Sequence, residues 1–427
     1  MKNLITKMFD LEERKIRDID IITTDEDVFA IITLKAEPIE CPHCKATTSR
    51  THDYRQRTIN HAILNGHNTC LVYNQRRYFC SSCRKAFPEP NPFVFSGRRI
   101  SKYTILRVMK MLMDPRVTFS MAASATDLSV SSVQRIFDMH AGIKTRPFPK
   151  ILCIDEVYAV KYHQKVYACV LVDFSNNQIY DLLPSRKKYD LANYFSQIPR
   201  EIRESVQYIS MDMWNTYREL ANLYFKNARV CVDSFHVVQM INTAFRKTRI
   251  RIMNSYNRKS DEYYLMKKFA WLLSKEYRKL NFSKPLKLYR YIPLIGTRTV
   301  YVQDLIASIL SIDPELEVAY MLKEDYLTLN QQCSFDDVES ALDNYIERLE
   351  LYDVPEFRSV KRSLWNWKQE IINSFNKVNG RRISNGPVES VNARIKLIKF
   401  SSNGYTNFER FRKRVLYSLN DTSSIKF

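Results

Sequence analysis

Two pairs of closely spaced cysteines constrain the fold of this 427-residue chain more than any other feature. Cys41 and Cys44 form one C-x-x-C pair, and Cys80 and Cys83 form the other. Four thiolates at these spacings can close a tetrahedron around Zn²⁺, which leaves no open position for catalysis. The other five cysteines are scattered, so the pattern favours a metal site over a set of disulfides. We predict a zinc ribbon holding one structural zinc ion; the alternative is one surface pair beside unrelated core cysteines.

The net charge of +20 at pH 7 indicates which kind of molecule the chain binds. Lysine and arginine side chains that neutralise phosphates release counterions, so a chain this basic is typical of nucleic-acid-binding proteins. A merely basic soluble enzyme is the alternative. The longest apolar stretches, such as 166–172, have the length of a strand, and the first 20 residues contain no signal-peptide core. We therefore expect neither secretion nor a membrane segment, and a cytoplasmic location.

The order of apolar runs predicts a multidomain α/β protein. A β-branched stretch over 15–35 predicts a hairpin before the first cysteine pair, and helical periodicity covers 101–140. The predicted order from residue 151 onward is β-β-β-α-β-α-β, a mixed sheet whose strands lie at 151–154, 167–172, 178–183, 206–210 and 229–232. After His236 the chain is charged and helical in pattern, which we interpret as an inserted all-α domain. A last helix begins at Asn385-Gly386-Pro387, because proline suits a first helical position.

The segment from Thr118 to His140 predicts a helix-turn-helix, with Ser129 at the turn. Small residues pack the first helix, and short polar residues open the second, as in a recognition helix that enters the DNA major groove. The outward-facing residues that we expect to contact DNA are Ser131, Ser132, Gln134 and Arg135. An ordinary αα-hairpin is the alternative.

Three acidic residues stand where the chemistry of phosphoryl transfer would need them. Asp155 and Asp212 each follow an apolar strand run, and Glu389 lies in the first turn of the last helix. Carboxylates at the ends of adjacent central strands come close together, which is costly unless cations lie between them. Three carboxylates suffice to hold two Mg²⁺ (or Mn²⁺) ions for in-line displacement at phosphorus. Helical spacing places Asn392 and Lys396 on the same face as Glu389.

Two basic runs flank the predicted carboxylate site along the sequence. Their usual interpretation is a solvated helix face. Because both runs lie next to the acidic segments, we predict instead that they line a channel for DNA. The residues assigned to this role are Arg246, Lys247, Arg249, Arg251, Arg394 and Lys399, and the basic residues 410–414 belong to the same predicted patch.

Several motifs together give the chain a specific resemblance over nearly its whole length. They are 41–44, 80–83, Ile154-Asp155-Glu156, 211–217 (MDMWNTY), 232–238 (VDSFHVV), 385–396 (NGPVESVNARIK) and 404–412 (GYTNFERFR). The chain resembles the bacterial insertion-sequence transposases of the ISL-three type, in the ribonuclease H-like DDE group. The resemblance implies that Asp155, Asp212 and Glu389 are the catalytic, metal-binding triad.

Two neighbouring acids leave the assignment of the triad open. Glu156 adjoins Asp155, but strand alternation turns its side chain to the opposite face. Asp233 follows another strand and forms an Asp-x-x-His element with His236, as beside the triad of related transposases. We interpret Asp233 and His236 as accessory to the active site, with Asp233 as the alternative second ligand.

The resemblance divides the chain into five segments: a zinc ribbon (1–92), a helix-turn-helix (93–148), the first part of a ribonuclease H-like core (149–240), an all-α insertion (241–380), and the final core helix with a basic C-terminal helix (381–427). We expect binding of terminal inverted repeats, metal-dependent DNA cleavage and strand transfer. The expected partners are double-stranded transposon ends and target DNA, bound by a homodimer on the bacterial nucleoid. The alternatives are a transposase-derived regulator without catalysis and a structure-selective nuclease of the same fold.

Overall fold

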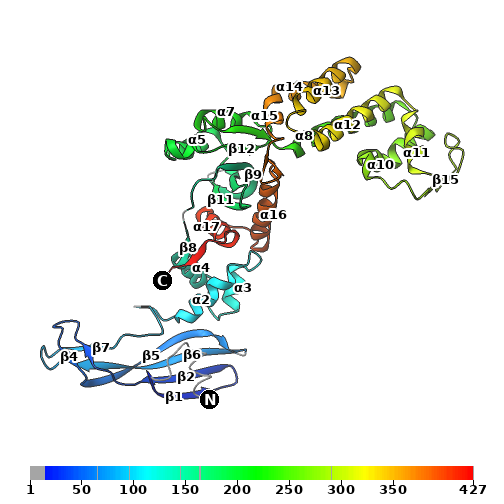
Figure 1. Cartoon of the computed structure of the whole chain (residues 1–427). Helices are drawn as coiled ribbons and strands as arrows, with labels where there is room; N and C mark the ends of the chain where they lie inside the picture. Colours follow the sequence, from blue (N-terminus) through cyan, green and yellow to red (C-terminus); the bar gives the residue numbers. More distant parts are fainter. Residues whose placement is uncertain are drawn as a thin grey trace. The chain divides into compact units, whose positions relative to one another are not determined.

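The computed structural model describes residues 15–64, 66–95, 97–144, 146–162, 165–289 and 291–426. The chain forms two compact units, coloured along the sequence in Figure 1. The first contains residues 1–146, 158–166 and 393–427, and the second contains 147–157 and 167–392. Each unit is therefore assembled from segments that are distant in sequence. No helix among the described residues is both long enough and apolar enough to cross a membrane.

The N-terminal sheet of the first unit supports the two cysteine pairs. Its strand order is β1-β2-β6-β5, with β7 paired to β6. The strands are β1 (Ile16–Thr23), β2 (Asp27–Leu34), β5 (Thr51–Leu64), β6 (His67–Phe79) and β7 (Ala86–Pro88). The predicted hairpin is confirmed as the antiparallel pair β1–β2. The residues between the cysteine pairs form the long antiparallel hairpin β5–β6.

A helical bundle completes the first unit. It consists of α2 (Lys102–Met111), α3 (Phe119–Ser124), α4 (Val130–His140) and α17 (Phe408–Leu419). The first three helices begin where a hydroxyl caps a free backbone amide: the side chains of Ser101, Thr118 and Ser129 accept from the N–H three residues on. Strand β8 (Ala141–Ile143) then pairs with β18 (Ser423–Ile425).

Helix α17 lies elsewhere than the sequence suggested. The sequence predicts that it accompanies the final core helix and offers a basic surface. Instead Tyr417 packs into the core of the α2–α4 bundle. The guanidinium of Arg414 is 1% exposed and donates to the carbonyl oxygens of Leu112, Asp114 and Val117 in the α2–α3 connection. Arg414 therefore holds the bundle together and is withdrawn from the predicted DNA channel.

The second unit is built on a five-stranded sheet with the order β11-β10-β9-β12-β13. Its strands are β9 (Ile151–Tyr162), β10 (Lys165–Asp173), β11 (Gln178–Leu183), β12 (Tyr208–Met211) and β13 (Arg229–Val232). Strand β12 is parallel to both β9 and β13, whereas β10 and β11 are antiparallel. Helices α5 (Lys188–Ser196), α6 (Arg200–Glu204) and α7 (Asn215–Tyr224) occupy the connections.

Two local details of this sheet differ from the prediction. Asp155 does not end its strand, because β9 continues to Tyr162. The pairing of β9 with β12 nevertheless stops at Cys153, so Asp155 lies just beyond the paired segment. The short helix α6 was not predicted, since it buries no side chain and so leaves no apolar period in the sequence.

The segment after His236 is mainly helical. It contains α8 (Ser234–Ser255), α9 (Asp261–Lys268), α10 (Ala270–Ser274), α11 (Val302–Leu310), α12 (Pro314–Gln332), α13 (Val338–Tyr352), α14 (Arg358–Asn366) and α15 (Lys368–Asn373). Two short hairpins, β14–β15 (Leu286–Lys287, Thr299–Val300) and β16–β17 (Lys377–Val378, Arg381–Arg382), interrupt it. Helix α16 (Gly386–Ser401) follows.

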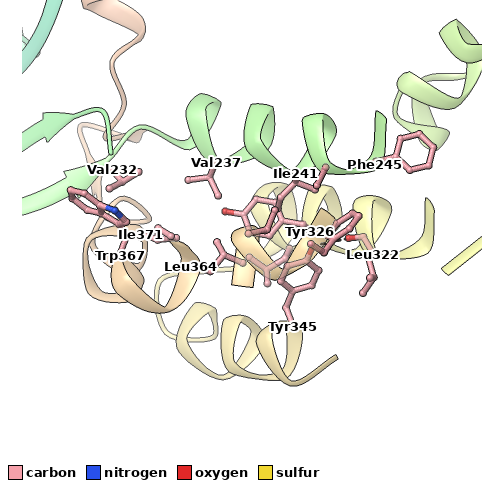
Figure 2. Close-up of a cluster of buried hydrophobic side chains, with 14 of the residues drawn as sticks. Val232, Val237, Ile241, Phe245, Leu322, Tyr326, Tyr345, Leu364, Trp367 and Ile371 are labelled. Atoms are coloured by element: carbon pink, nitrogen blue, oxygen red, sulfur yellow. Dashed lines mark hydrogen bonds between the residues drawn. The ribbon is translucent and has the colours of Figure 1, made fainter. Parts of the chain in front are cut away.

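A shared hydrophobic core fixes these helices to the sheet. Figure 2 shows Val232 of β13 and Val237 of α8 in one cluster with Tyr326 of α12, Tyr345 of α13 and Ile371 of α15. All five side chains are at most 3% exposed. Burying an apolar side chain of this size contributes roughly 1.5–3 kcal/mol. The start of α8 is therefore held firmly against the end of β13, where acidic residues gather.

Candidate functional site

The four paired cysteines come together as predicted. Their Sγ atoms all lie within 4.8 Å of one another. The Sγ atoms of Cys41 and Cys83 are 3.7 Å apart, and those of Cys44 and Cys80 are 3.5 Å apart. This donor set fits Zn²⁺, which takes four thiolates in a tetrahedron.

Both cysteine pairs form the same backbone turn. The N–H of Lys45 donates to the Cys41 carbonyl, and the N–H of Arg84 donates to the Cys80 carbonyl, at 2.9 and 2.8 Å. Lys45 and Arg84 both adopt positive φ angles, 66° and 58°. Backbone hydrogen bonds thus close each turn without help from side chains. In this conformation both thiols of a pair face the same point.

The thiols of the cluster differ in their pKa values. A backbone hydrogen bond from Cys83 and the neighbouring thiols lower the pKa of Cys80 to about 6. At Cys44 the backbone amide of Ala46 lowers the pKa, but Cys80 and the other thiols outweigh it and raise the pKa to about 12. Four thiols this close cannot all ionise without a cation between them. The cluster is therefore chemically incomplete as a set of free thiols.

The acidic residues of the second unit come from three adjacent strands. Asp155 lies in β9, Asp212 directly follows β12, and Asp233 directly follows β13. The parallel register pairs Ser210 with Cys153, which brings Asp212 level with Asp155. All three carboxylates therefore lie at one edge of the sheet, as the apolar strand runs predicted.

Asp212, Asp233 and His236 form the tightest group. One ligand atom from each lies within 4.8 Å of the others. His236 Nε2 donates to Asp212 Oδ1 at 2.9 Å, and this hydrogen bond raises the pKa of His236. The structure thus brings His236 into direct contact with Asp212, a predicted triad member, and places an oxygen of Asp233 within 4.8 Å of them.

Asn385 connects the three strand ends, a role that no local sequence pattern predicts. Its backbone N–H donates to Asp233 Oδ1 at 3.1 Å, and its side-chain amide donates to Asp212 Oδ1 at 3.3 Å and to the Ile154 carbonyl at 3.2 Å. The residue is 1% exposed. An asparagine before Gly-Pro signals a helix start, but nothing local shows that it also bridges β9, β12 and β13.

Helix α16 contains the remaining predicted residues, and one of them, Asn392, contacts an acid. Asn392 Nδ2 donates to Asp155 Oδ2 at 2.7 Å. Glu389, one turn before it, is exposed, and its charge contributes to raising the pKa of Asp233, although burial is the main cause. Lys396 is exposed on the same helix. The side-chain oxygens of Asn385 and Asn392 are buried without a hydrogen-bond partner among the described residues.

The acids repel one another in the absence of a cation. Burial is the main cause that raises the pKa of Asp155 to about 7, and the charge of Asp212 acts in the same direction. Unpaired buried acceptors are costly as well. Clustered carboxylates with orphaned oxygens nearby fit divalent cations, which prefer oxygen ligands.

Glu156 faces away from this cluster, as strand alternation predicted. Its carboxylate pairs with Arg186 and accepts a hydrogen bond from the Tyr217 hydroxyl at 3.2 Å. The Arg186 guanidinium also lies over the rings of Tyr167 and Trp214, 4.3 and 5.3 Å from their centroids. Both carboxylate oxygens of Glu156 thus bind partners on the face of β9 opposite to Asp155.

The predicted DNA-contacting residues of α4 are only partly available. Ser131 and Arg135 are exposed, and Ser132 is half-buried beside the Ser129 cap. The Gln134 side-chain oxygen accepts from Arg410 of α17 at 3.2 Å, and Arg410 in turn pairs with Asp138. Helix α17 thus occupies one side of α4, which leaves the Ser131–Arg135 side open.

The basic run of α8 requires a correction. Arg249 is 8% exposed and donates to the Met266 carbonyl at 2.7 Å, so its charge is directed inward. Arg251 is held by Glu315 and Glu356. Arg246 and Lys247 remain exposed. On α16, Arg394 is exposed, while Lys399 Nζ donates to the Tyr158 carbonyl.

Two family models match parts of this chain. Residues 152–415 match the model of the ISL3-type DDE transposase family, described as transposase. Residues 37–83 match the zinc finger of the transposases IS204, IS1001, IS1096 and IS1165. A curated relative, the transposase for insertion sequence element IS1001 of Bordetella parapertussis, is 22% identical over 62% of this chain and 66% of its own length. A Lactococcus lactis protein described as an ATP-dependent protease is 27% identical over 26% of this chain and 34% of its own length.

Proposed function

The chain belongs to the ISL3-type family of DDE transposases, and on that premise we propose that it cuts and joins DNA at the ends of an insertion sequence. The observation that carries the proposal is the convergence of Asp155, Asp212 and Asp233 at one sheet edge, tied to the start of α16 by Asn385. The strand order is β11-β10-β9-β12-β13, and the three parallel strands β9, β12 and β13 carry the acids. This order supports a ribonuclease H-like core.

We assign Asp155, Asp212 and Glu389 as ligands of two Mg²⁺ or Mn²⁺ ions. Such ions, when bound, activate the attacking oxygen and stabilise the leaving oxygen of an in-line phosphoryl transfer. Asn392 orients the Asp155 carboxylate, while His236 and Asn385 orient that of Asp212. Asp233 accepts a hydrogen bond from the Asn385 backbone amide and so holds the start of α16. Because Asp233 lies close to Asp212, it is the alternative metal ligand.

Substitution of each acid tests the assignment. Asp155→Asn, Asp212→Asn and Glu389→Gln should each abolish Mg²⁺-dependent cleavage of inverted-repeat DNA. Binding of that DNA should be retained, because affinity depends on basic residues. Asp233→Asn is the matched comparison. If Asp233→Asn lost cleavage while Asp212→Asn kept it, Asp233 would be the metal ligand and Asp212 the supporting residue. A wild-type rate in any triad variant removes that acid from the assignment.

We propose that the N-terminal half recognises the DNA end. The zinc ribbon holds one Zn²⁺ through Cys41, Cys44, Cys80 and Cys83, and helix α4 enters the major groove with Ser131 and Arg135 forward. Two copies acting on paired ends would account for joining both to one target. Metal analysis of the reduced protein should give about one zinc per chain, lost in Cys80→Ser. Freshly purified protein without zinc would contradict the ribbon assignment.

A further inference from the structure

A cavity of about 600 Å³ opens beside the first turn of α8, and neither the acids nor the zinc ribbon uses it. Its volume lies within the ~300–1,000 Å³ typical of small-molecule sites. The walls come from α8, from the segment 274–279 after α10, and from α12. The residues that matter for recognition are Phe235, Val238, Asn242, Lys275, Lys279 and Leu327.

The cavity begins one residue from the acidic cluster. Phe235 immediately precedes His236, whose imidazole is bonded to Asp212. The rings of Phe235 and His236 meet edge to face, with centroids 5.8 Å apart and planes at 88°. None of Asp212, Asp233 and His236 lines the cavity, so a group resting on Phe235 would lie beside the acidic cluster and not within it.

The lining offers a surface on which a flat ring can stack. Phe235 is 56% exposed, although it stands in the first turn of a helix that buries most of its apolar residues. Leu327, at 7% exposure, supplies an apolar wall of the same cavity. An exposed aromatic ring beside an apolar wall suits the flat face of a ring-shaped ligand.

The charges at the rim suit an anionic backbone. Lys275 has no carboxylate partner within the described chain, and its ammonium group lies over the Trp271 ring. The acid of the lining, Glu276, pairs with Lys279 at 2.9 Å and with Arg278 at 3.7 Å, and it also accepts a hydrogen bond from Gln331. A phosphate next to the bound group would therefore meet a net positive rim.

We propose that this cavity receives one unstacked base of the DNA strand next to the phosphate that is cut. The inference rests on the proposed function, because a nucleic acid strand must reach the acids for a base to reach Phe235. Every base has a flat face that stacks on an aromatic ring, so the cavity is tolerant of sequence. Moving a base out of the helix bends the strand locally and exposes the neighbouring phosphate.

A cleavage assay with abasic DNA tests the proposal. The cut position is mapped first with wild-type protein, and a single abasic nucleotide is then placed in turn at each of the neighbouring positions. On intact DNA, Phe235→Ala should slow cleavage by roughly tenfold or more, as expected for loss of one stacking ring. Phe235→Trp should retain cleavage. At one abasic position the rates of wild type and Phe235→Ala should become equal, because no base remains to be housed.

Controls separate the cavity from the active site and from folding. Trp365→Ala removes another aromatic side chain of the same unit, 66% exposed on α14, and should cleave like wild type. Phe235→Leu keeps the bulk beside His236 and loses the ring face, so it should behave like Phe235→Ala. An equal deficit of Phe235→Ala on intact DNA and at every abasic position would mean that Phe235 only supports His236, which overturns the proposal. Wild-type cleavage by Phe235→Ala also overturns it, whereas absence of cleavage by the wild-type protein would reject the proposed function itself.

Discussion

The backbone N–H of Asn385 donates to the carboxylate of Asp233, 152 positions earlier in the chain. Through this bond and its side-chain amide, one residue fixes the start of α16 against three strand ends. The positions of Asp212 and Glu389 therefore depend on a neutral residue that carries no chemistry of its own.

Asn385→Ala should lower the cleavage rate by about ten- to a hundredfold while DNA binding is kept, because Asp212 and the Ile154 carbonyl lose their shared side-chain donor. Unfolding should also require about 1–3 kcal/mol less free energy, since buried partners are left unpaired. Asn373→Ala is a matched control: Asn373 Nδ2 donates to the Val230 carbonyl of β13 but touches no acid. That variant should lose stability without losing cleavage in the folded protein, and equal rate losses in both variants would argue against a positioning role.

Metal affinity should rise with pH. Burial, assisted by Asp212, raises the pKa of Asp155 to about 7 in the metal-free protein. A carboxylate must be ionised to bind a metal, so protons compete with Mn²⁺ below this value. Titration calorimetry between about pH 6 and pH 8 should show tighter Mn²⁺ binding at the higher pH, with proton release. Asp155→Asn should flatten this dependence. The same shift stabilises the metal-free fold at low pH, and that contribution is lost as pH rises from about 4 through about 7.

His61 should make the N-terminal domain sensitive to acid. Burial, with a smaller effect from Arg107, lowers the pKa of His61 to about 4, and its Nδ1 is 2.9 Å from the Ser101 hydroxyl that caps α2. The neutral imidazole is thus favoured by folding, so its contribution is present above about pH 6.5 and is lost as pH falls toward 4. Unfolding free energies should drop by about 2 kcal/mol between pH 7 and pH 5 from this residue.

Two histidine variants measured by denaturant unfolding would isolate this effect. His61→Gln should show a weaker pH dependence, whereas His52→Gln, at an exposed position, should retain it. A wild-type pH dependence in His61→Gln would assign the acid sensitivity to other groups.

DNA specificity should depend on Arg135 more than on Gln134. Arg135 is exposed and unpaired within the described residues, whereas the Gln134 oxygen is already bonded to Arg410. Arg135→Ala should reduce discrimination between inverted-repeat and random DNA by about 1–3 kcal/mol in binding titrations. An unchanged affinity ratio would place specificity in the zinc ribbon.

Exposed and buried basic residues of α8 should have different roles: the exposed ones should contribute to DNA binding, and the buried ones to stability. Arg246→Ala should weaken binding to both DNAs and reduce the salt dependence by roughly one unit of log–log slope. Arg249→Ala should instead lower the unfolding free energy, because its guanidinium bonds a carbonyl inside the protein. Equal salt effects in the two variants would contradict the burial of Arg249.

The strands and acids were predictable because their signals are local. Short apolar runs that end before Asp212 and Asp233 mark neighbouring parallel strands, and parallel strands gather their carboxyl ends at one edge. The spacing of the cysteine pairs likewise predicted that the four thiols come together. The pairing of Asn385 with β9, β12 and β13 has no such signal, because its partners lie far away in sequence.

Burial of charge was the other quantity that local pattern could not supply. Arg249 and Arg414 stand in runs of basic residues, and membership of such a run does not distinguish them from the exposed Arg246. Each is buried because a distant segment offers carbonyl oxygens: Met266 for Arg249, and the α2–α3 connection for Arg414. A count of basic residues therefore overstates the surface that can meet phosphates.

The docking of α17 onto α2–α4 makes the order of synthesis matter. Arg414 reaches back 302 positions to Leu112, and Tyr417 completes a core whose other helices leave the ribosome much earlier. A nascent or truncated chain without α17 has an α2–α4 bundle that lacks Tyr417 in its core and the hydrogen bonds of Arg414 on one side. If α4 contacts DNA as proposed, such fragments should bind DNA ends more weakly than complete chains, so that recognition develops only in chains that also carry the acids.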